Sequence, residues 1–208
     1  MQKITFVTGN KGKIATAQQY LNELNIKLET YDYDIIEPQS DKLTEIAKSK
    51  VTQAYKIVNQ PCIANDSGFY IEALNGFPSV FVRYALDTIG VEGILKLMDG
   101  VEPRTCMFKE CLAYYDGTSI EYFHCEHVGT LSDKILGNDN PEKWSDLWYV
   151  FIPDYSTSGR TLAQYTIGET QERRKHIDSS LKRFAKWYKK QLTPSQNSHN
   201  TAHSFLHL

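Results

Sequence analysis

The sequence predicts an α/β protein in which helices flank a mixed sheet and a later hairpin forms a second lobe. Strand and helix patterns alternate over residues 1–100, as they do in βαβ units. After Arg104 the pattern changes to two long strands joined by a turn at Asp116-Gly117. Polar residues follow two of the apolar runs, at the position where open α/β sheets place ligands. Together these features favour two lobes with a cleft between them.

The first half of the chain carries the most regular patterns. Residues 4–7 are an apolar run typical of a strand, and residues 14–24 carry apolar side chains at helical spacing. Pro38 ends regular structure, and Ser40 or Asp41 can cap the helix that follows. The other elements expected in this half are strands at 27–33, 61–64 and 69–74 and helices at 43–58, 82–86 and 90–98.

The second half is expected to contain one hairpin, one short strand and one long helix. Its polar, loop-rich part spans residues 131–148. An apolar face at helical spacing predicts a single helix over 169–192. The strands are expected at 105–115, 119–129 and 149–153.

We expect one two-lobed domain over residues 1–192, followed by a polar tail at 193–208. The tail carries histidines four residues apart, at His199, His203 and His207. Helical metal spacing is one interpretation of this pattern, and a loose polar tail is the simpler one.

Composition and charge narrow the possible classes of protein. The chain has 208 residues and a net charge of −2, so no overall charge favours binding to a nucleic acid polymer or an anionic membrane. No apolar stretch is long enough to cross a bilayer, and the N-terminus enters a strand pattern with no signal peptide. We therefore expect a cytoplasmic protein. The cysteines lack CxxC spacing and are expected to be buried free thiols (Cys62, Cys106, Cys111 and Cys125).

The first turn, residues 8–13, is a candidate phosphate site. Gly9 and Gly12 allow the backbone to bend and a ligand to approach closely. The start of the following helix offers free N–H groups and a positive dipole end, both of which suit phosphate. Thr8, Asn10 and Lys13 add side-chain donors. An ordinary βα turn that uses Gly and Asn for its geometry is the alternative interpretation.

A second polar segment, Asn65-Asp66-Ser67-Gly68, follows the short buried strand at 61–64. We expect it to form a turn that faces the first one across a cleft. The alternative is that Asp66 only forms the turn, as an Asx residue.

At this point the chain resembles the inosine triphosphate pyrophosphatase family of nucleoside triphosphate pyrophosphatases. Residues 6–10 with Lys13 match the family's opening T-G-N-x-x-K. Residues 35–39 match its acidic segment, and residues 63–68 match its D-D-S-G or E-D-S-G turn. Residues 69–100 follow the archaeal and eukaryotic members closely, and all four stretches keep the family's order.

The resemblance implies an elongated, two-lobed α/β fold with a central cleft, and a homodimer. It implies Mg²⁺-dependent hydrolysis of the α–β phosphate bond of a nucleoside triphosphate, which yields a monophosphate and pyrophosphate. By position, Glu37 and Asp66 would serve the metal and the attacking water, with Lys13 in the catalytic group. The substrate-binding positions implied in this half are Thr8, Gly9, Asn10, Lys13, Ser67 and Gly68. Glu37 as an ordinary surface acid remains the alternative.

The physical chemistry of these residue types agrees with the implied roles. Mg²⁺ prefers oxygen ligands and is usually held by one or two carboxylates together with phosphate. A carboxylate near a metal-bound water can orient that water and take its proton. The metal and lysines then stabilise the charge that develops on the phosphoryl oxygens.

The second half departs from the family at the aromatic loop. The family's G-F-G-[YW]-D-P motif before the last strand is lost, although residues 151–153 match the end of that strand. Trp144, Trp148 or Tyr149 can still offer a flat face to a base. One or two of them packing in the core is the alternative.

The C-terminal K-x-x-x-S-H-R motif of the family is also degraded. His176 keeps the family's His position, while Ile177 replaces the following Arg and Lys175 the preceding Ser. Arg173, Arg174 and Lys175 form a basic cluster that either replaces the lost charge or is a solvated helix face.

These departures lead to one main hypothesis and two alternatives. The main hypothesis is a pyrophosphatase for a nucleoside triphosphate with altered base preference, because a site that loses hydrogen-bonding groups rarely keeps its selectivity. The first alternative is a catalytically weak or inactive nucleotide sensor of the same fold, since Asn65 replaces the family's first acid. The second, a flavodoxin-like or Rossmann-like binder, is disfavoured by the absence of GxGxxG. Phe77, Phe81 and Tyr84 are candidates for a dimer interface.

Overall fold

The computed structural model describes residues 2–33 and 35–192 and shows one seven-stranded mixed sheet. The expected tail at 193–208, with its three histidines, lies outside the described residues. The strands follow the order β2-β1-β3-β5-β6-β7, and β4 pairs with β3 off this path. Their bounds are β1 (Lys3–Val7), β2 (Lys27–Tyr31), β3 (Cys62–Ile71), β4 (Pro78–Ser79), β5 (Thr105–Tyr115), β6 (Ile120–Leu131) and β7 (Phe151–Pro153).

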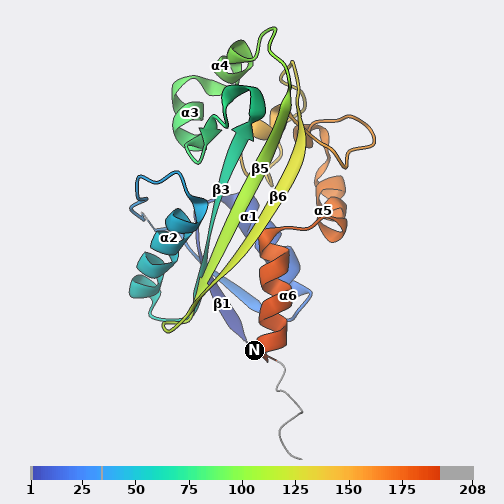
Figure 1. Cartoon of the computed structure of the whole chain (residues 1–208). Helices are drawn as coiled ribbons and strands as arrows, with labels where there is room; N and C mark the ends of the chain where they lie inside the picture. The colour runs from blue at the N-terminus through green and yellow to red at the C-terminus, as the bar shows by residue number, and fades with distance from the viewer. Residues whose placement is uncertain (1, 34, 193–208) are drawn as a thin grey trace, which may run out of the picture.

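The sheet is parallel at one end and antiparallel over the rest, as the sequence predicts. β1 pairs in parallel with β2 and with β3, whereas β3, β5, β6 and β7 pair antiparallel. β3, β5 and β6 run along the length of the molecule and join its two ends (Figure 1). These three strands therefore carry both lobes.

Helices cover both faces of the sheet near β1. Helix α2 (Leu43–Val58) lies on one face, and α1 (Lys11–Asn22) and α6 (Ser180–Leu192) lie on the other (Figure 1). The two faces have separate apolar cores, because successive residues of a strand point to opposite faces. On β5, for example, Leu112 packs toward α6 and Cys111 toward α2.

The far end of the sheet has a third core. It lies beneath helices α3 (Val82–Thr88) and α4 (Gly90–Leu97) and includes Phe69, Ile94 and Phe151. Three short 3₁₀ helices complete the described chain: η1 (Glu72–Leu74), η2 (Asp146–Tyr149) and η3 (Leu162–Gln164). The expected strands at 69–74 and 149–153 are thus shorter, since residues 72–74 and 149 are in 3₁₀ helices.

The turn expected at Asn65–Gly68 is wrong. β3 is one continuous strand through these residues, and β5 pairs with it along its whole length. Asn65, Asp66 and Ser67 are typical of turns, but ten consecutive residue pairs with β5 outweigh that local preference.

The single helix expected over 169–192 is also wrong. The structure has α5 (Ile167–His176) and α6, which are separated by residues 177–179. Ser179 caps the start of α6, since its Oγ accepts a hydrogen bond from Lys182 N at 3.1 Å. The apolar spacing continues through the break, so it gave no signal of the break. No helix within the described ranges is long and apolar enough to cross a membrane.

Candidate active site

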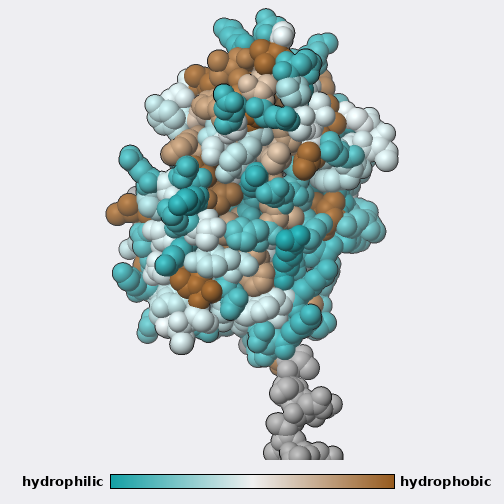
Figure 2. Space-filling model, viewed as in Figure 1, coloured by the Kyte–Doolittle hydropathy of each residue, from teal (hydrophilic) through white to brown (hydrophobic). Residues whose placement is uncertain are grey.

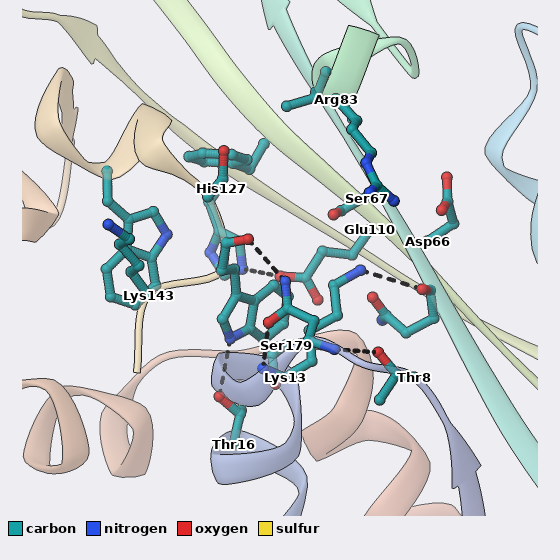
Figure 3. A pocket seen from close by; sticks show the side chains of 18 of the residues that line it. Thr8, Lys13, Thr16, Asp66, Ser67, Arg83, Glu110, His127, Lys143 and Ser179 are labelled. Atoms are coloured by element: carbon teal, nitrogen blue, oxygen red, sulfur yellow. Dashed lines mark hydrogen bonds and ion pairs between the residues drawn. The ribbon is translucent and has the colours of Figure 1, made fainter. Parts of the chain in front are cut away.

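A cavity of about 770 Å³ lies where the edge of β3 is left uncovered. β1 pairs with β3 only as far as Ile63, and β4 pairs with it only from Phe69. Residues 64–68 therefore have a neighbouring strand on one side only. The cavity opens along this free edge, and Figure 3 shows side chains from both lobes pointing into it.

The first turn forms one wall of the cavity, and its polar side chains shape it. Thr8 Oγ1 accepts from Asn10 N at 3.1 Å. Asn10 caps α1, since its Oδ1 accepts from Lys13 N at 3.0 Å, and its Nδ2 donates to Trp144 O at 2.9 Å. The Thr and Asn of the motif thus fix the turn and tie it to the loop that carries Trp144.

The two glycines of this turn allow close approach to protein atoms. A Cβ on Gly12 would lie 2.5 Å from Glu142 O, with Lys143 O closer still. A Cβ on Gly9 would lie 2.5 Å from Asp32 Oδ1. Neither glycine has a positive φ. The expectation that Gly12 serves a ligand is therefore corrected, because this glycine lets the loop at 142–143 reach α1. Gly9 lines the cavity, and its expected role toward a ligand stays a prediction.

Lys13 reaches from α1 to the free edge of β3. Its Nζ donates to Asn65 O at 3.2 Å and lies 5.6 Å from the centre of the Trp144 ring. The side chain is buried, and this burial lowers its pKa to about 8, against the attraction of Asp66. Lys13 is therefore a poorly solvated cation that would gain from an anionic ligand.

Glu37 and Asp66 meet at a second cation, Lys50, which the sequence did not single out. Lys50 Nζ, on α2, lies 2.6 Å from Glu37 Oε1 and 2.6 Å from Asp66 Oδ1. Burial alone would lower the pKa of Lys50, but the two carboxylates outweigh burial and raise it. The structure thus brings both predicted acids together, next to the first turn.

The donor set suits a hard divalent cation. The described residues contain no group of three or more His, Cys, Asp or Glu side chains that could hold a metal by themselves. Two adjacent carboxylates and open space for a ligand's oxygens match the way Mg²⁺ is usually bound, by one or two carboxylates plus phosphate. Glu37 and Asp66 are the residues that would hold it.

The other two residues of the predicted second wall differ in role. Ser67 lines the cavity. Gly68 also lines it, but a Cβ there would lie 2.7 Å from Ser79 O, so this glycine allows β4 to pair. Asn65 donates from Nδ2 to Ser180 Oγ at 2.8 Å, and its buried Oδ1 has no hydrogen-bond partner among the residues that the structure describes.

The three aromatic residues of the loop occupy different environments in the structure. Trp144 lines the cavity and donates from Nε1 to Thr16 Oγ1 at 3.1 Å. Trp148 also lines it but is only 5% exposed and belongs to the third core. Tyr149 lies outside the cavity, with Lys143 Nζ near its ring and its hydroxyl.

The basic cluster of α5 is split in the same way. Arg173 lines the cavity, with its guanidinium 5.6 Å from the centre of the Trp148 ring. Arg174 also lines the cavity, and its buried side chain is paired with Glu142. The predicted binding residues Lys175 and His176 face away from the cavity, where both pair with Glu172. Both residues lie on the side of α5 that carries Glu172, whereas Arg173 and Arg174 of the same turn line the cavity.

Sequence reasoning missed several cavity residues with ionisable side chains, among them Lys50, Glu110 and His127. Lys50 lies in α2, and the periodicity of apolar residues in this helix identifies only its apolar face, to which Lys50 does not belong. Glu110 and His127 lie in the two strands of the predicted hairpin. The available signal was a Glu that begins the otherwise apolar, buried stretch at the end of β5.

Known proteins similar to this chain point to one family. The sequence model of the Ham1 family matches residues 4–187. A dITP/XTP pyrophosphatase of Methanopyrus kandleri is 38% identical over 90% of this chain and 96% of that protein. One of Saccharolobus solfataricus is 33% identical over 89% and 93%. Among solved structures, a HAM1 protein from Coxiella burnetii has the same fold, with a TM-score of 0.76 at 21% identity over 91% of this chain and all of that one.

Proposed function

The chain belongs to the Ham1 family, and from this premise and the geometry of the cavity we propose that it is a nucleoside triphosphate pyrophosphatase. The reaction is hydrolysis at the α–β phosphate bond, with a nucleoside monophosphate and pyrophosphate as products. The observation that carries the proposal is the convergence of Lys13, Lys50, Glu37 and Asp66 on the free edge of β3. The similar archaeal proteins named dITP/XTP pyrophosphatases support it.

Each of these residues has a role in the proposed reaction. Lys13 and Lys50 bind the phosphates, since each is a cation with little exposure to water. Asp66 orients the attacking water and accepts its proton, because it is the carboxylate on the free edge itself. Glu37 and Asp66 hold Mg²⁺, which when bound supplies stabilisation of charge on the phosphoryl oxygens.

The base occupies the other end of the cavity in this proposal. That end is lined mainly by aromatic and apolar side chains, including Trp148, Phe108 and Phe151. Arg173 and Arg174 of the basic cluster both line the cavity, and the Nε of Arg173 is buried without a hydrogen-bond partner among the described residues. This unpaired donor supports recognition of the base by a hydrogen bond from Arg173.

We further propose a homodimer, a cytoplasmic location and one domain over residues 1–192. Exposed apolar side chains near α3 and α4 (Phe77, Phe81, Tyr84, Ile89 and Leu97) support the dimer, and Figure 2 shows hydrophobic surface at that end of the molecule. All four cysteines are free and buried, which suits a reducing compartment.

A panel of nucleotides tests the proposal. Pyrophosphate release is measured with Mg²⁺ for the four standard nucleotides, their deoxy forms, and the inosine, xanthosine and modified-base triphosphates. Release from one or a few of them is the expected result. Orthophosphate release without pyrophosphate would overturn the assigned bond.

The second candidate function is a nucleotide sensor that binds without hydrolysis. The observation in its favour is Asn65, which occupies the position of the family's first acid and has a buried Oδ1 without a hydrogen-bond partner in the described part of the chain. Tight binding of a nucleotide in a thermal-shift assay, with no pyrophosphate released from any of the panel, would select this function over the first.

A further inference from the structure

A buried glutamate and a histidine line the cavity from neighbouring strands, and the proposed hydrolysis uses neither. Glu110 Oε1, on β5, lies 3.2 Å from His127 Nε2, on β6. Glu110 Oε2 accepts from Ser180 N at 3.2 Å and from Ser180 Oγ at 2.6 Å. Glu110 is 5% exposed, so its charge needs these partners to be tolerated. Both of its carboxylate oxygens are engaged by neighbouring side chains or backbone.

At neutral pH the pair is an imidazolium and a carboxylate. Burial would lower the pKa of His127, but hydrogen bonds to Cys125 and Glu110 outweigh burial and raise it to about 9. Burial would raise the pKa of Glu110, but the hydrogen bond and charge of His127, together with the hydrogen bonds from Ser180, outweigh burial and lower this pKa. The other titratable groups coupled to Glu110 are Lys13 and Tyr20 from α1, Tyr155 from the loop after β7, and Arg183 from α6.

The imidazolium has one donor left over. Nε2 is directed at Glu110, and Nδ1 makes no hydrogen bond to any residue in the described ranges. The ring is part of the cavity wall, and Figure 3 shows it joined to Glu110 among the labelled lining side chains. Because both nitrogens of an imidazolium are donors, Nδ1 can serve a hydrogen-bond acceptor on a ligand.

His127 lies at the aromatic end of the cavity. Its cross-strand partner is Phe108, whose ring centre lies 4.9 Å from that of Phe151. Trp148 and Arg173 line the same cavity. The cations at the other end, Lys13 and Lys50, reach in from the helices of the β1 lobe. The free donor of His127 therefore lies beside the aromatic side chains that would contact a flat base.

We propose that His127 is a specificity-determining residue that donates a hydrogen bond from Nδ1 to an acceptor atom on the base of the bound nucleotide. Glu110 is the positioning residue that fixes the ring through Nε2. The inference rests on the proposed function for the identity of the ligand. It predicts that a base with a carbonyl oxygen at the contact is preferred to one with an amino group, because two donors cannot share a hydrogen bond.

The test compares a nucleotide with a ligand that has no base. Binding of inosine triphosphate and of inorganic tripolyphosphate is measured by calorimetry for His127→Gln in an Asp66→Asn background, which prevents turnover. The expected result is about tenfold weaker binding of the nucleotide, as for loss of a hydrogen bond from a charged donor, with tripolyphosphate affinity unchanged. Equal weakening of both ligands, or no change in either, would overturn the role of His127.

Two further variants keep the test decisive. His124→Gln is the matched control, because His124 is an exposed histidine on the same strand, and its register places it on the opposite face. Its nucleotide affinity should equal that of the parent. If His127→Gln does not fold, Glu110→Gln/His127→Gln removes both buried charges together, and the same difference between the two ligands is expected.

A kinetic measurement separates this inference from the proposed function. In the wild-type background, the ratio of kcat/KM for inosine triphosphate to that for ATP should fall at least about fivefold in His127→Gln. An unchanged ratio contradicts the role of His127 and leaves pyrophosphate release intact. Absence of pyrophosphate release by the wild type contradicts the proposed function, and the binding experiment still decides the inference.

Discussion

The ammonium of Lys50 lies 2.6 Å from Oδ1 of Asp66, although the two residues come from a helix and from the middle of a strand. The same nitrogen lies 2.6 Å from Glu37. Asp66 is largely buried, so Lys50 offsets a charge that would otherwise be costly. It also holds the two predicted acids at one point of the cavity wall.

Replacing Lys50 by Met should therefore affect both folding and activity. We expect the free energy of unfolding to fall by about 2 kcal/mol, less than for a fully buried pair because Glu37 is largely exposed. We expect kcat/KM to fall at least about tenfold, since a cation near the phosphates is lost. Lys48→Met, at an exposed position of the same helix, is the control for both measurements. Equal results for the two variants would contradict the assigned role of Lys50.

Gly12→Ala should displace the loop at 142–143 from α1. Its Cβ would lie 2.5 Å from Glu142 O, a backbone atom that cannot rotate away. We expect a loss of about 1–3 kcal/mol in unfolding free energy. Gly168→Ala is the matched control, because a Cβ at this helical glycine meets nothing within 4 Å. That variant should be neutral or more stable by up to about 1 kcal/mol. Denaturant melts measure both, and a stable Gly12→Ala would refute the close approach.

The activity should decline with increasing pH because of Lys13. Burial lowers the pKa of this lysine to about 8, so the free protein loses the cation as pH rises through that value. We expect kcat/KM for the nucleotide to fall above about pH 8. Lys13→Arg should move the decline to higher pH, since arginine stays protonated. A pH profile identical in the two proteins would show that another group causes the decline.

The lowered pKa of Lys13 should also make the folded protein more stable as pH rises, whereas the activity should fall. The folded-state pKa of Lys13 lies below its ordinary value, so the unfolded chain binds more protons between about pH 8 and pH 10.5. The contribution of this residue to the unfolding free energy therefore rises with pH across that window. Melts of the wild type and Lys13→Met across the window should show the difference between them changing in the wild type's favour as pH rises. A constant difference would contradict the lowered pKa.

Much of the parallel part of the fold could be predicted from sequence because its signals are local. The strand, turn and helix around residues 4–24 appear close to where hydrophobic periodicity places them. Asn65–Gly68 could not be predicted, because its strand conformation depends on pairing with β5, more than forty residues away along the chain. The helix break at 177–179 depends on a cap at Ser179 and on bonds from Ser180 to Glu110, which apolar spacing does not reveal.

Site residues that belong to a contiguous sequence motif could be predicted. Site residues that only the fold brings together were missed. Lys13, Glu37 and Asp66 were found from short stretches, and the structure brings them to one cavity. Lys50 and His127 lie in a helix and a strand whose hydrophobic patterns indicate only which residues are buried. Their roles in the site depend on partners from other elements, Asp66 and Glu110. Lys175 and His176 were placed at the site by register alone, and α5 turns them away from it.

The most direct test of the account is the identity of the products formed by the wild type and by Asp66→Asn. Products from the nucleotide that gives the highest rate, with Mg²⁺, are resolved by phosphorus NMR. The account predicts nucleoside monophosphate and pyrophosphate in equal amounts from the wild type. From Asp66→Asn, which should keep the thermal stability of a folded protein, it predicts a rate lower by about 100-fold or more. Nucleoside diphosphate and orthophosphate as products, or an unchanged rate in Asp66→Asn, would contradict it.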